Sequence, residues 1–295
     1  MSFVSFAKPK AEQPKYVFYF ILDGCGVNTI LATEMYQASL EGKIGRVPTL
    51  MSTFPVASVA STFSYTNGVT DSSASGTALA SGVNTYNGAM GVDPDTIPVY
   101  SISSWAKQSG KLVGVGSSVC INHATPGAQY AHRPSRNQYY EIGLDLAASG
   151  FDFFGASDFN MATGRKRDQR SLHEIATDSG YVIARGLEDY DAKKGSANKL
   201  IFFQKQAESD VDPGSLPYWI DHKPGQVSAP DVVKAQIDFL YSKDTKKNGF
   251  FIMNEIGGKI DYASHPNDAA TAFAEVATAD SCVRVAYDFY LQHPD

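Results

Sequence analysis

Short apolar runs alternate along this chain with longer stretches in which apolar positions recur every three or four residues. Residues 16–22 (YVFYFIL) end at Asp23-Gly24 and predict a buried strand that runs into a tight turn. Residues 249–255 (GFFIMNE) predict another fully buried strand. The same criteria predict further strands at 56–63, 111–116, 151–154, 181–184 and 200–203, and helices at 29–42, 138–149, 229–242 and 267–292.

Apolar strands that alternate with helices indicate a parallel sheet covered on both faces, which is an α/β fold with three layers. Residues 155–230 are less regular and are interpreted as a sheet edge plus an insert. In sheets of this kind, ligands bind beyond the carboxyl ends of the strands. Polar residues that directly follow the predicted strands are therefore the first place to look for chemistry.

Composition limits the classes of function. With 295 residues, 43% of them hydrophobic, the chain can bury the core of one large domain, or of one domain with an insert. A net charge of −6 argues against nucleic acid as the main partner. No stretch approaches the roughly 20 apolar residues of a membrane span, and residues 1–15 lack the pattern of a signal peptide.

The three cysteines, Cys25, Cys120 and Cys282, are widely spaced and fit neither a zinc finger nor a dense disulfide framework. Because their number is odd, at least one thiol must be free or must pair with another chain. Their pairing and the redox compartment stay open on this evidence.

A segment rich in serine and glycine, residues 70–78 (TDSSASGTA), allows three interpretations. It can be a flexible linker, or an ordinary helix start with Asp71 or Ser72 as the N-cap. It can also be a phosphate site, because the N–H groups and the positive dipole end of a helix N-terminus suit an anion. A serine nucleophile there would need a base or a metal to activate it, and no histidine lies nearby in the sequence.

Candidate metal ligands follow several predicted strands. Asp23 ends the first strand and can be either a turn residue or a ligand. His123 and Thr125 alternate, so in an extended segment both would face one side. Arg136 is a candidate phosphate ligand, since a guanidinium can hold two oxygens, or else a solvated surface charge.

A second group of candidate ligands follows the strand at residues 249–255. Glu255 ends this buried strand, where a charge needs a partner. Asp261 and His265 lie four residues apart, which is about one turn if the segment is helical. An aspartate and a histidine are an ordinary pair of zinc ligands.

At this point the residues match a known family. Residues 69–93 (VTDSSASGTALASGVNTYNGAMGVD) closely resemble the nucleophile segment of alkaline phosphatases. The resemblance implies that family's three-layer α/β/α sandwich and a metal-dependent hydrolase of phosphate monoesters that acts through a phosphoserine. Three other blocks resemble the family in the same order: residues 23–26 its first metal-binding turn, residues 123–126 with Arg136 its next block, and residues 257–265 (GGKIDYASH) its zinc block.

The resemblance also implies roles for single residues. Ser72 would be the nucleophile, and Asp71 would orient Arg136, which holds the phosphate. Two zinc ions and one magnesium ion would be bound, with Asp23 bridging a zinc and the magnesium, and Ser72 also facing zinc. His123, Thr125 and Glu255 would complete the magnesium site, and Asp261 and His265 would hold the other zinc.

The sequence departs from the family pattern in three places that matter. Tyr262 follows Asp261, at a position where family members carry varied residues that tune the phosphate site. Glu255 precedes Asp261 by six residues where the pattern has five, so Ile256 looks inserted. The pattern also continues past Asp295 with a strand and three further zinc ligands. We therefore expect residues 1–295 to form a single alkaline-phosphatase-like domain that lacks its C-terminal segment, with an irregular insert at about 155–230, and to be impaired in zinc binding and activity.

Two alternatives to a phosphate monoesterase stay open. One is a phosphodiesterase or phosphonate hydrolase of the same superfamily; the other is a non-catalytic remnant that binds metal or phosphate. Arg136 and the magnesium-type site favour monoesters, because both neutralise a dianion. The resemblance further implies a periplasmic or secreted protein whose partners are small phosphate monoesters and inorganic phosphate, and it allows a homodimer.

Overall fold

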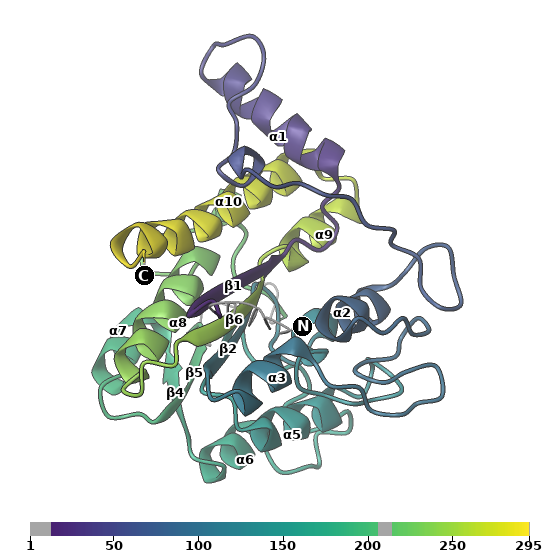
Figure 1. Ribbon diagram of the computed structural model, residues 1–295, viewed down its shortest axis with the longest axis vertical. Coiled ribbons are helices and arrows are strands. Elements are labelled where there is room, and N and C mark those ends of the chain that lie inside the picture. Colours follow the sequence, from purple (N-terminus) through teal and green to yellow (C-terminus); the bar gives the residue numbers. More distant parts are fainter. Residues whose placement is uncertain (1–12, 206–213, 295) are drawn as a thin grey trace, which may run out of the picture.

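The computed structural model describes residues 13–205 and 214–294, and within them six parallel strands form one sheet in the order β1-β6-β2-β3-β5-β4 (Figure 1). The β-branched and aromatic runs of the sequence form these strands, because such side chains pack well on a pleated surface. The strands are β1 (Tyr16–Ile21), β2 (Leu112–Ser117), β3 (Phe153–Ala156), β4 (Tyr181–Arg185), β5 (Lys199–Phe203) and β6 (Phe250–Glu255).

The sheet is buried on both faces, as alternate residues of β6 show. Phe250 and Ile252 enter one hydrophobic core, whereas Phe251 and Met253 enter the other. The first core lies under α7 (Gly186–Lys193), α8 (Ala229–Lys243) and α10 (Ala269–Gln292). Helices α3 (Ile102–Gln108), α4 (Ala124–Gly127), α5 (Tyr139–Ser149) and α6 (Leu172–Asp178) cover the other face (Figure 1). The predicted three-layer α/β/α sandwich is therefore confirmed.

Three further helices complete the frame around one end of the sheet. Helix α2 (Ser72–Ser81) packs on α4, and α9 (Gly258–Ser264) packs on α10. Helix α1 (Val27–Leu40) lies beyond α10 at the top of Figure 1. None of the helices within the described ranges combines the length and the apolar composition needed to cross a membrane.

One predicted strand is wrong. Residues 56–63 form no strand, and Val56 and Val59 are 84% and 94% exposed. Their β-branched side chains suit a strand, but no neighbouring strand supplies the hydrogen bonds that hold one in place. The strands predicted at 181–184 and 200–203 are confirmed as β4 and β5, which form the sheet edge farthest from β1. The three cysteines form no disulfide with one another.

Candidate active site

A cavity of about 510 Å³ opens beyond the carboxyl ends of β1, β2 and β6. Such an edge is where parallel sheets place their ligands. Residues that are far apart in the sequence meet there because the strands that precede them are neighbours in the sheet. The lining includes seven of the residues singled out from the sequence: Asp23, Asp71, Ser72, His123, Arg136, Asp261 and His265.

The serine-rich segment forms a helix start and not a linker. Asp71 is the N-cap of α2, and its carboxylate accepts a hydrogen bond from the Ala74 N–H at 2.9 Å. Ser72 is therefore the first residue of the helix, at its positive dipole end. A Cβ atom on Gly76 would lie 3.3 Å from the Thr125 Cα. The small residues of this segment thus let α2 pack closely on α4.

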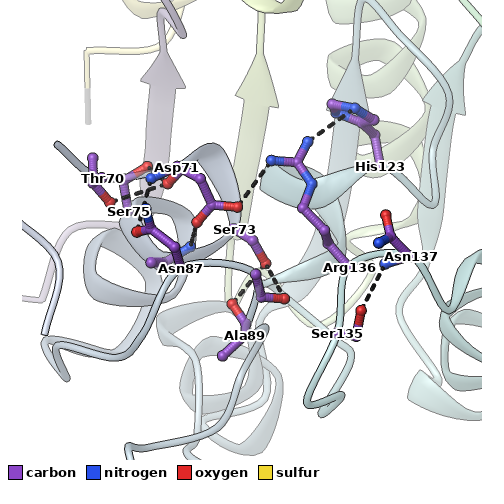
Figure 2. A network of polar contacts seen from close by, with 12 residues as sticks. Thr70, Asp71, Ser73, Ser75, Asn87, Ala89, His123, Ser135, Arg136 and Asn137 are labelled. Atoms are coloured by element: carbon purple, nitrogen blue, oxygen red, sulfur yellow. Dashed lines mark hydrogen bonds and ion pairs between the residues drawn. The ribbon is translucent and has the colours of Figure 1, made fainter. Parts of the chain in front are cut away.

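Arg136 is held in place on two sides, so it is not a freely solvated charge. Its Nη1 donates to Asp71 Oδ2 at 3.0 Å, and its Nη2 lies 3.3 Å from His123 Nε2 (Figure 2). The side chain is 24% exposed. The Arg136 backbone N–H donates to the Gly88 carbonyl at 2.7 Å. These contacts fix the guanidinium on the cavity wall beside the start of α2, where it can hold an anion.

Asp23 lies between the nucleophile candidate and α9. Burial raises the pKa of Asp23, and the negative charge of Asp261 raises it further. A hydrogen bond from Ser72 and the positive charge of Arg136 lower the pKa of Asp23 in part. The Ser72 hydroxyl therefore lies beside a carboxylate that has another carboxylate as its neighbour, an arrangement that a cation would stabilise.

Glu255 is the last residue of β6 and is buried at the carboxyl end of the sheet, beside the cavity. The register aligns it with Ile21 of β1 and Ser117 of β2. The Ser117 hydroxyl donates to Glu255 Oε2 at 2.6 Å, while Oε1 is buried and has no hydrogen-bond partner within the described part of the chain. Burial, with the charge of Asp23 next, raises the pKa of Glu255 to about 8. Ile256 continues the ladder by donating its N–H to the Ile21 carbonyl at 3.0 Å, and Glu255 lies close enough to Asp23 for the charge of Asp23 to raise its pKa.

His123 and Thr125 do not lie in an extended segment, the arrangement in which both side chains would face one side. His123 is the N-cap of α4, and Thr125 lies in its first turn, because residues 124–127 are helical. Both side chains are nevertheless buried, and the Thr125 hydroxyl lies close enough to Glu255 to lower the pKa of that carboxyl. Burial, with Arg136 next, lowers the pKa of His123 to about 4. Its imidazole is thus neutral, as a metal ligand requires.

Asp261 and His265 face each other across one turn at the end of α9. Asp261 Oδ2 lies 3.4 Å from His265 Nε2. The His265 side chain is largely exposed at the cavity mouth. An aspartate and a histidine on one side of a helix can bind one zinc ion together, although three protein ligands are usual in catalytic zinc sites.

Two observations test whether these donors fit divalent cations. Within residues 13–205 and 214–294, no three His, Cys, Asp or Glu side chains are gathered closely enough to form a metal centre on their own. However, the negative charge of Asp23 raises the pKa of Glu255, and Glu255 has a buried oxygen without a hydrogen-bond partner among the described residues. The hydroxyls of Ser117 and Thr125 flank that carboxylate. This oxygen-rich donor set fits a hard cation such as Mg²⁺.

Two glycines allow the turn after β1 and the turn after β6 to approach each other closely. A Cβ atom on Gly257 would lie 2.1 Å from the Asp23 nitrogen, and one on Gly24 would lie 2.5 Å from the Asp261 Cα. Gly24 also has a φ of +69°, which favours glycine. The turn after β1 and the turn after β6 are therefore in direct backbone contact, and this contact sets the distance between Asp23 and Asp261.

The substitution Gly257→Ala is expected to lower the free energy of unfolding by about 1–3 kcal/mol, because the new methyl group would overlap backbone atoms that cannot move aside. Urea denaturation monitored by circular dichroism would measure the change. Gly68→Ala is the matched control, since a Cβ atom there meets nothing within 4 Å. Equal stability of the two variants would contradict the close contact.

Residues that the sequence analysis missed also line or support the site. Ser117 ends β2 and hydrogen-bonds Glu255, whereas Thr70 and Ser75 line the cavity. Ser117 could have been found, since it directly follows the predicted strand at 111–116. Nothing in the sequence distinguishes Thr70 and Ser75 from other hydroxyl residues near the start of α2.

Comparison with known proteins assigns the whole of the described chain to one group. A family model described as alkaline phosphatase matches residues 14–160 and 153–294. Alkaline phosphatase 4 of Bacillus subtilis is 33% identical over 224 residues, which cover 75% of this chain and 46% of that protein. The repressible alkaline phosphatase of Saccharomyces cerevisiae is 30% identical over 315 residues, with 97% and 54% covered. The chain thus spans about half the length of these relatives.

Solved structures give the same result for the fold. The alkaline phosphatase of the Antarctic bacterium TAB5 superposes with a TM-score of 0.81 at 29% identity, covering 95% of this chain and 75% of that chain. A variant of the TAB5 enzyme, solved with Mg bound, also gives a TM-score of 0.81, at 28% identity and with 95% and 74% covered.

Proposed function

Because this chain belongs to the alkaline phosphatase family, we propose that it hydrolyses phosphate monoesters through a phosphoserine formed at Ser72. The observation that supports this most directly is the shared cavity, in which Ser72 at the start of α2 lies with Asp23 and Arg136. The family's activity, substrates and partners are extended here to a chain that spans about half of its relatives.

The residues around Ser72 have distinct roles in the proposed reaction. Ser72 attacks the phosphorus atom while the bond from phosphorus to the leaving oxygen breaks, and the Ser72 hydroxyl proton is directed at the Asp23 carboxylate. The leaving oxygen takes up a proton and departs as the alcohol, and water then hydrolyses the phosphoserine to inorganic phosphate. The guanidinium of Arg136 and the N-terminus of α2 hold the phosphoryl oxygens, and stabilise the charge that develops on them. Asp71 keeps Arg136 in position through the 3.0 Å ion pair. This arrangement neutralises a dianion, which is the form of a monoester.

Divalent cations would bind around the same residues. Asp23, His123, Thr125 and Glu255 would hold magnesium, while Asp261 and His265 would hold one zinc, and Asp23 with Ser72 would face a second zinc. When bound, such ions activate oxygen nucleophiles and neutralise the charges of attacking and leaving oxygens. Because these residues supply fewer than three ligands to each zinc, we propose that a polypeptide of these 295 residues binds zinc weakly and turns over slowly.

The test is turnover of p-nitrophenyl phosphate and of bis-p-nitrophenyl phosphate by the purified 295-residue chain, with added Zn²⁺ and Mg²⁺ and after chelation. Monoester turnover is expected to exceed diester turnover and to fall on chelation. A preference for the diester would instead indicate a phosphodiesterase of the same superfamily. Metal binding without any turnover would indicate a remnant that only binds.

Location and assembly follow from family membership alone. We propose that the protein acts in the periplasm or outside the cell on small phosphate monoesters, that it releases inorganic phosphate, and that it forms a homodimer. Size-exclusion chromatography with light scattering would measure the oligomeric state.

A further inference from the structure

A tight turn at residues 86–89 (YNGA) contacts both parts of the candidate phosphate site. The Ala89 N–H donates to the Tyr86 carbonyl at 3.1 Å and closes the turn. Gly88, the third residue of the turn, has a φ of +90°, and a type II turn requires a positive φ at that position. Asn87 and Gly88 are therefore the two central residues of the turn, and each contacts a different segment of the site.

On one side, the Asn87 side chain pairs with the backbone that leads into α2. Its Oδ1 accepts a hydrogen bond from the Asp71 N–H at 3.1 Å, and its Nδ2 donates to the Val69 carbonyl at 3.1 Å (Figure 2). The amide thus contacts residues 69 and 71 in the way that a neighbouring parallel strand would. Asp71 is extended, with φ −99° and ψ 168°, and directly precedes Ser72, the first residue of the helix. Asn87 therefore fixes the direction in which the chain enters α2.

On the other side, the same turn holds the segment that carries Arg136. The Gly88 carbonyl accepts a hydrogen bond from the Arg136 N–H at 2.7 Å. Just after the turn, Met90 and Arg133 exchange two backbone hydrogen bonds, of 2.9 and 2.7 Å. The backbone of Arg136 is therefore fixed relative to the turn that also fixes the entry into α2.

The side chains of these two segments meet in one ion pair. Asp71 Oδ1 accepts from the Ala74 N–H at 2.9 Å, and Asp71 Oδ2 accepts from Arg136 Nη1 at 3.0 Å. A shift of the Asp71 backbone would therefore move the start of the helix and the guanidinium relative to each other. Asn87 is not among the residues that line the cavity, so any influence on a bound phosphate has to pass through Asp71 and Arg136.

We infer that Asn87 is a positioning residue, which holds the start of α2 and the guanidinium of Arg136 where both can contact one phosphoryl group. The inference rests on the proposed function for the roles of Ser72 and Arg136. An asparagine suits this place because its amide supplies an acceptor for the Asp71 N–H and a donor for the Val69 carbonyl. Alanine supplies neither group, and an ionised aspartate lacks the donor.

Equilibrium binding of inorganic phosphate tests the inference without turnover. Isothermal titration of the purified 295-residue chain, with Zn²⁺ and Mg²⁺ present, would compare Asn87→Ala with the unmodified chain. We expect Asn87→Ala to weaken phosphate binding about five- to fiftyfold, because small displacements of positioned groups have large effects.

Asn248→Ala is the matched control for this measurement. Asn248 also donates from Nδ2 to a backbone carbonyl, that of Gly110 at 3.2 Å, but it lies outside the cavity. Its phosphate affinity should stay within about twofold of the unmodified chain, as expected for a surface change. Both variants should unfold at similar urea concentrations, since neither asparagine is fully buried.

A double variant distinguishes positioning from a general loss of stability. In a chain with Arg136→Ala, the pair of groups that Asn87 aligns is incomplete. Adding Asn87→Ala to that chain should therefore weaken phosphate binding by less than about twofold. A merely structural role of Asn87 would give the same fold-change in both backgrounds.

The turn itself offers a second, independent pair of variants. Gly88 and Gly225 have φ values of +90° and +88°, and a Cβ atom on either would meet nothing within 4 Å. An alanine at either position strains only the backbone, so Gly88→Ala and Gly225→Ala should lose similar amounts of stability. Phosphate binding should weaken in Gly88→Ala alone, because the Gly88 carbonyl holds Arg136, whereas Gly225 lies outside the cavity.

Three results would overturn the inference: phosphate affinity of Asn87→Ala within twofold of the unmodified chain, an equal effect of Asn87→Ala in the Arg136→Ala background, or equal affinities of the two glycine variants. The proposed function fails separately. If phosphate binding depends on Asn87 in this way but p-nitrophenyl phosphate is not turned over, the positioning role stands and the proposed hydrolysis is wrong. An unmodified chain that binds no phosphate would overturn both.

Discussion

Replacing Ser72 by alanine is expected to lower the turnover of p-nitrophenyl phosphate at least about a thousandfold, because the variant lacks the nucleophile of the proposed phosphoserine. The loss should appear in kcat and not mainly in KM, since Arg136 and the start of α2 still hold the phosphate. Acid quenching of the unmodified chain with substrate, followed by mass spectrometry, should find a phosphoryl group on Ser72. The variant should carry none.

The control for this experiment lies at the other end of the same helix. Ser81→Ala also removes a serine hydroxyl, one that donates to the Thr77 carbonyl at 2.7 Å, and Ser81 lies outside the cavity. Its turnover should stay within about threefold of the unmodified chain, as expected for a surface change. A Ser72→Ala variant that keeps its turnover would show that hydrolysis does not proceed through this serine.

The parts of the site that could be predicted from the sequence share a physical cause. Asp23 follows one strongly apolar strand and Glu255 ends another, and such strands indicate a parallel sheet that is buried on both faces. The start of α2 follows from Asp71, which can cap a helix through its own side chain. In these places the local sequence and the global fold agree, so the predicted positions match the structure.

The features that could not be predicted from the sequence also share a physical cause, since they depend on contacts between distant segments. Residues 56–63 have the side chains of a strand, but whether a strand forms depends on a partner that no local pattern reveals. The helical turn at residues 124–127 was missed because it is a single turn that contains Pro126. Proline is tolerated in the first turn of a helix, where the missing N–H costs nothing. The contact of Ser117 with Glu255 depends on the order of the strands, which the sequence does not state.

A buried ion pair anchors α9, the helix that contains Asp261 and ends at His265. Lys259 Nζ lies 3.0 Å from Glu275 Oε2, and the two side chains are only 2% and 1% exposed. The ammonium also donates to the Pro217 carbonyl at 2.6 Å, and Glu275 Oε1 accepts from the Trp219 N–H at 2.6 Å. This network joins α9 to α10 and to the 3₁₀ turn η3 (Trp219–Asp221).

Lys259→Met is expected to lower the free energy of unfolding by about 3–5 kcal/mol, because Glu275 would stay buried without its counter-charge. The urea midpoint should fall with an unchanged slope. Adding Glu275→Gln should restore most of the loss, since the glutamine keeps an acceptor for the Trp219 N–H and has no charge. Lys234→Met, which breaks an exposed pair with Asp238 on α8, is the control and should cost less than about 1 kcal/mol.

These variants also distinguish an effect on the stability of the fold from an effect on the position of α9. In Lys259→Met the anchor of α9 is lost, so Zn²⁺ binding at the proposed site of Asp261 and His265 should weaken even under conditions in which the variant is fully folded. The double variant should recover more of its stability than of its metal affinity. Glu275→Gln removes the unpaired buried charge, which restores stability, but no ion pair then anchors α9. If Lys259→Met unfolds at the same urea concentration as Lys234→Met, the buried pair does not stabilise the fold, and another contact must fix α9 beside Asp23.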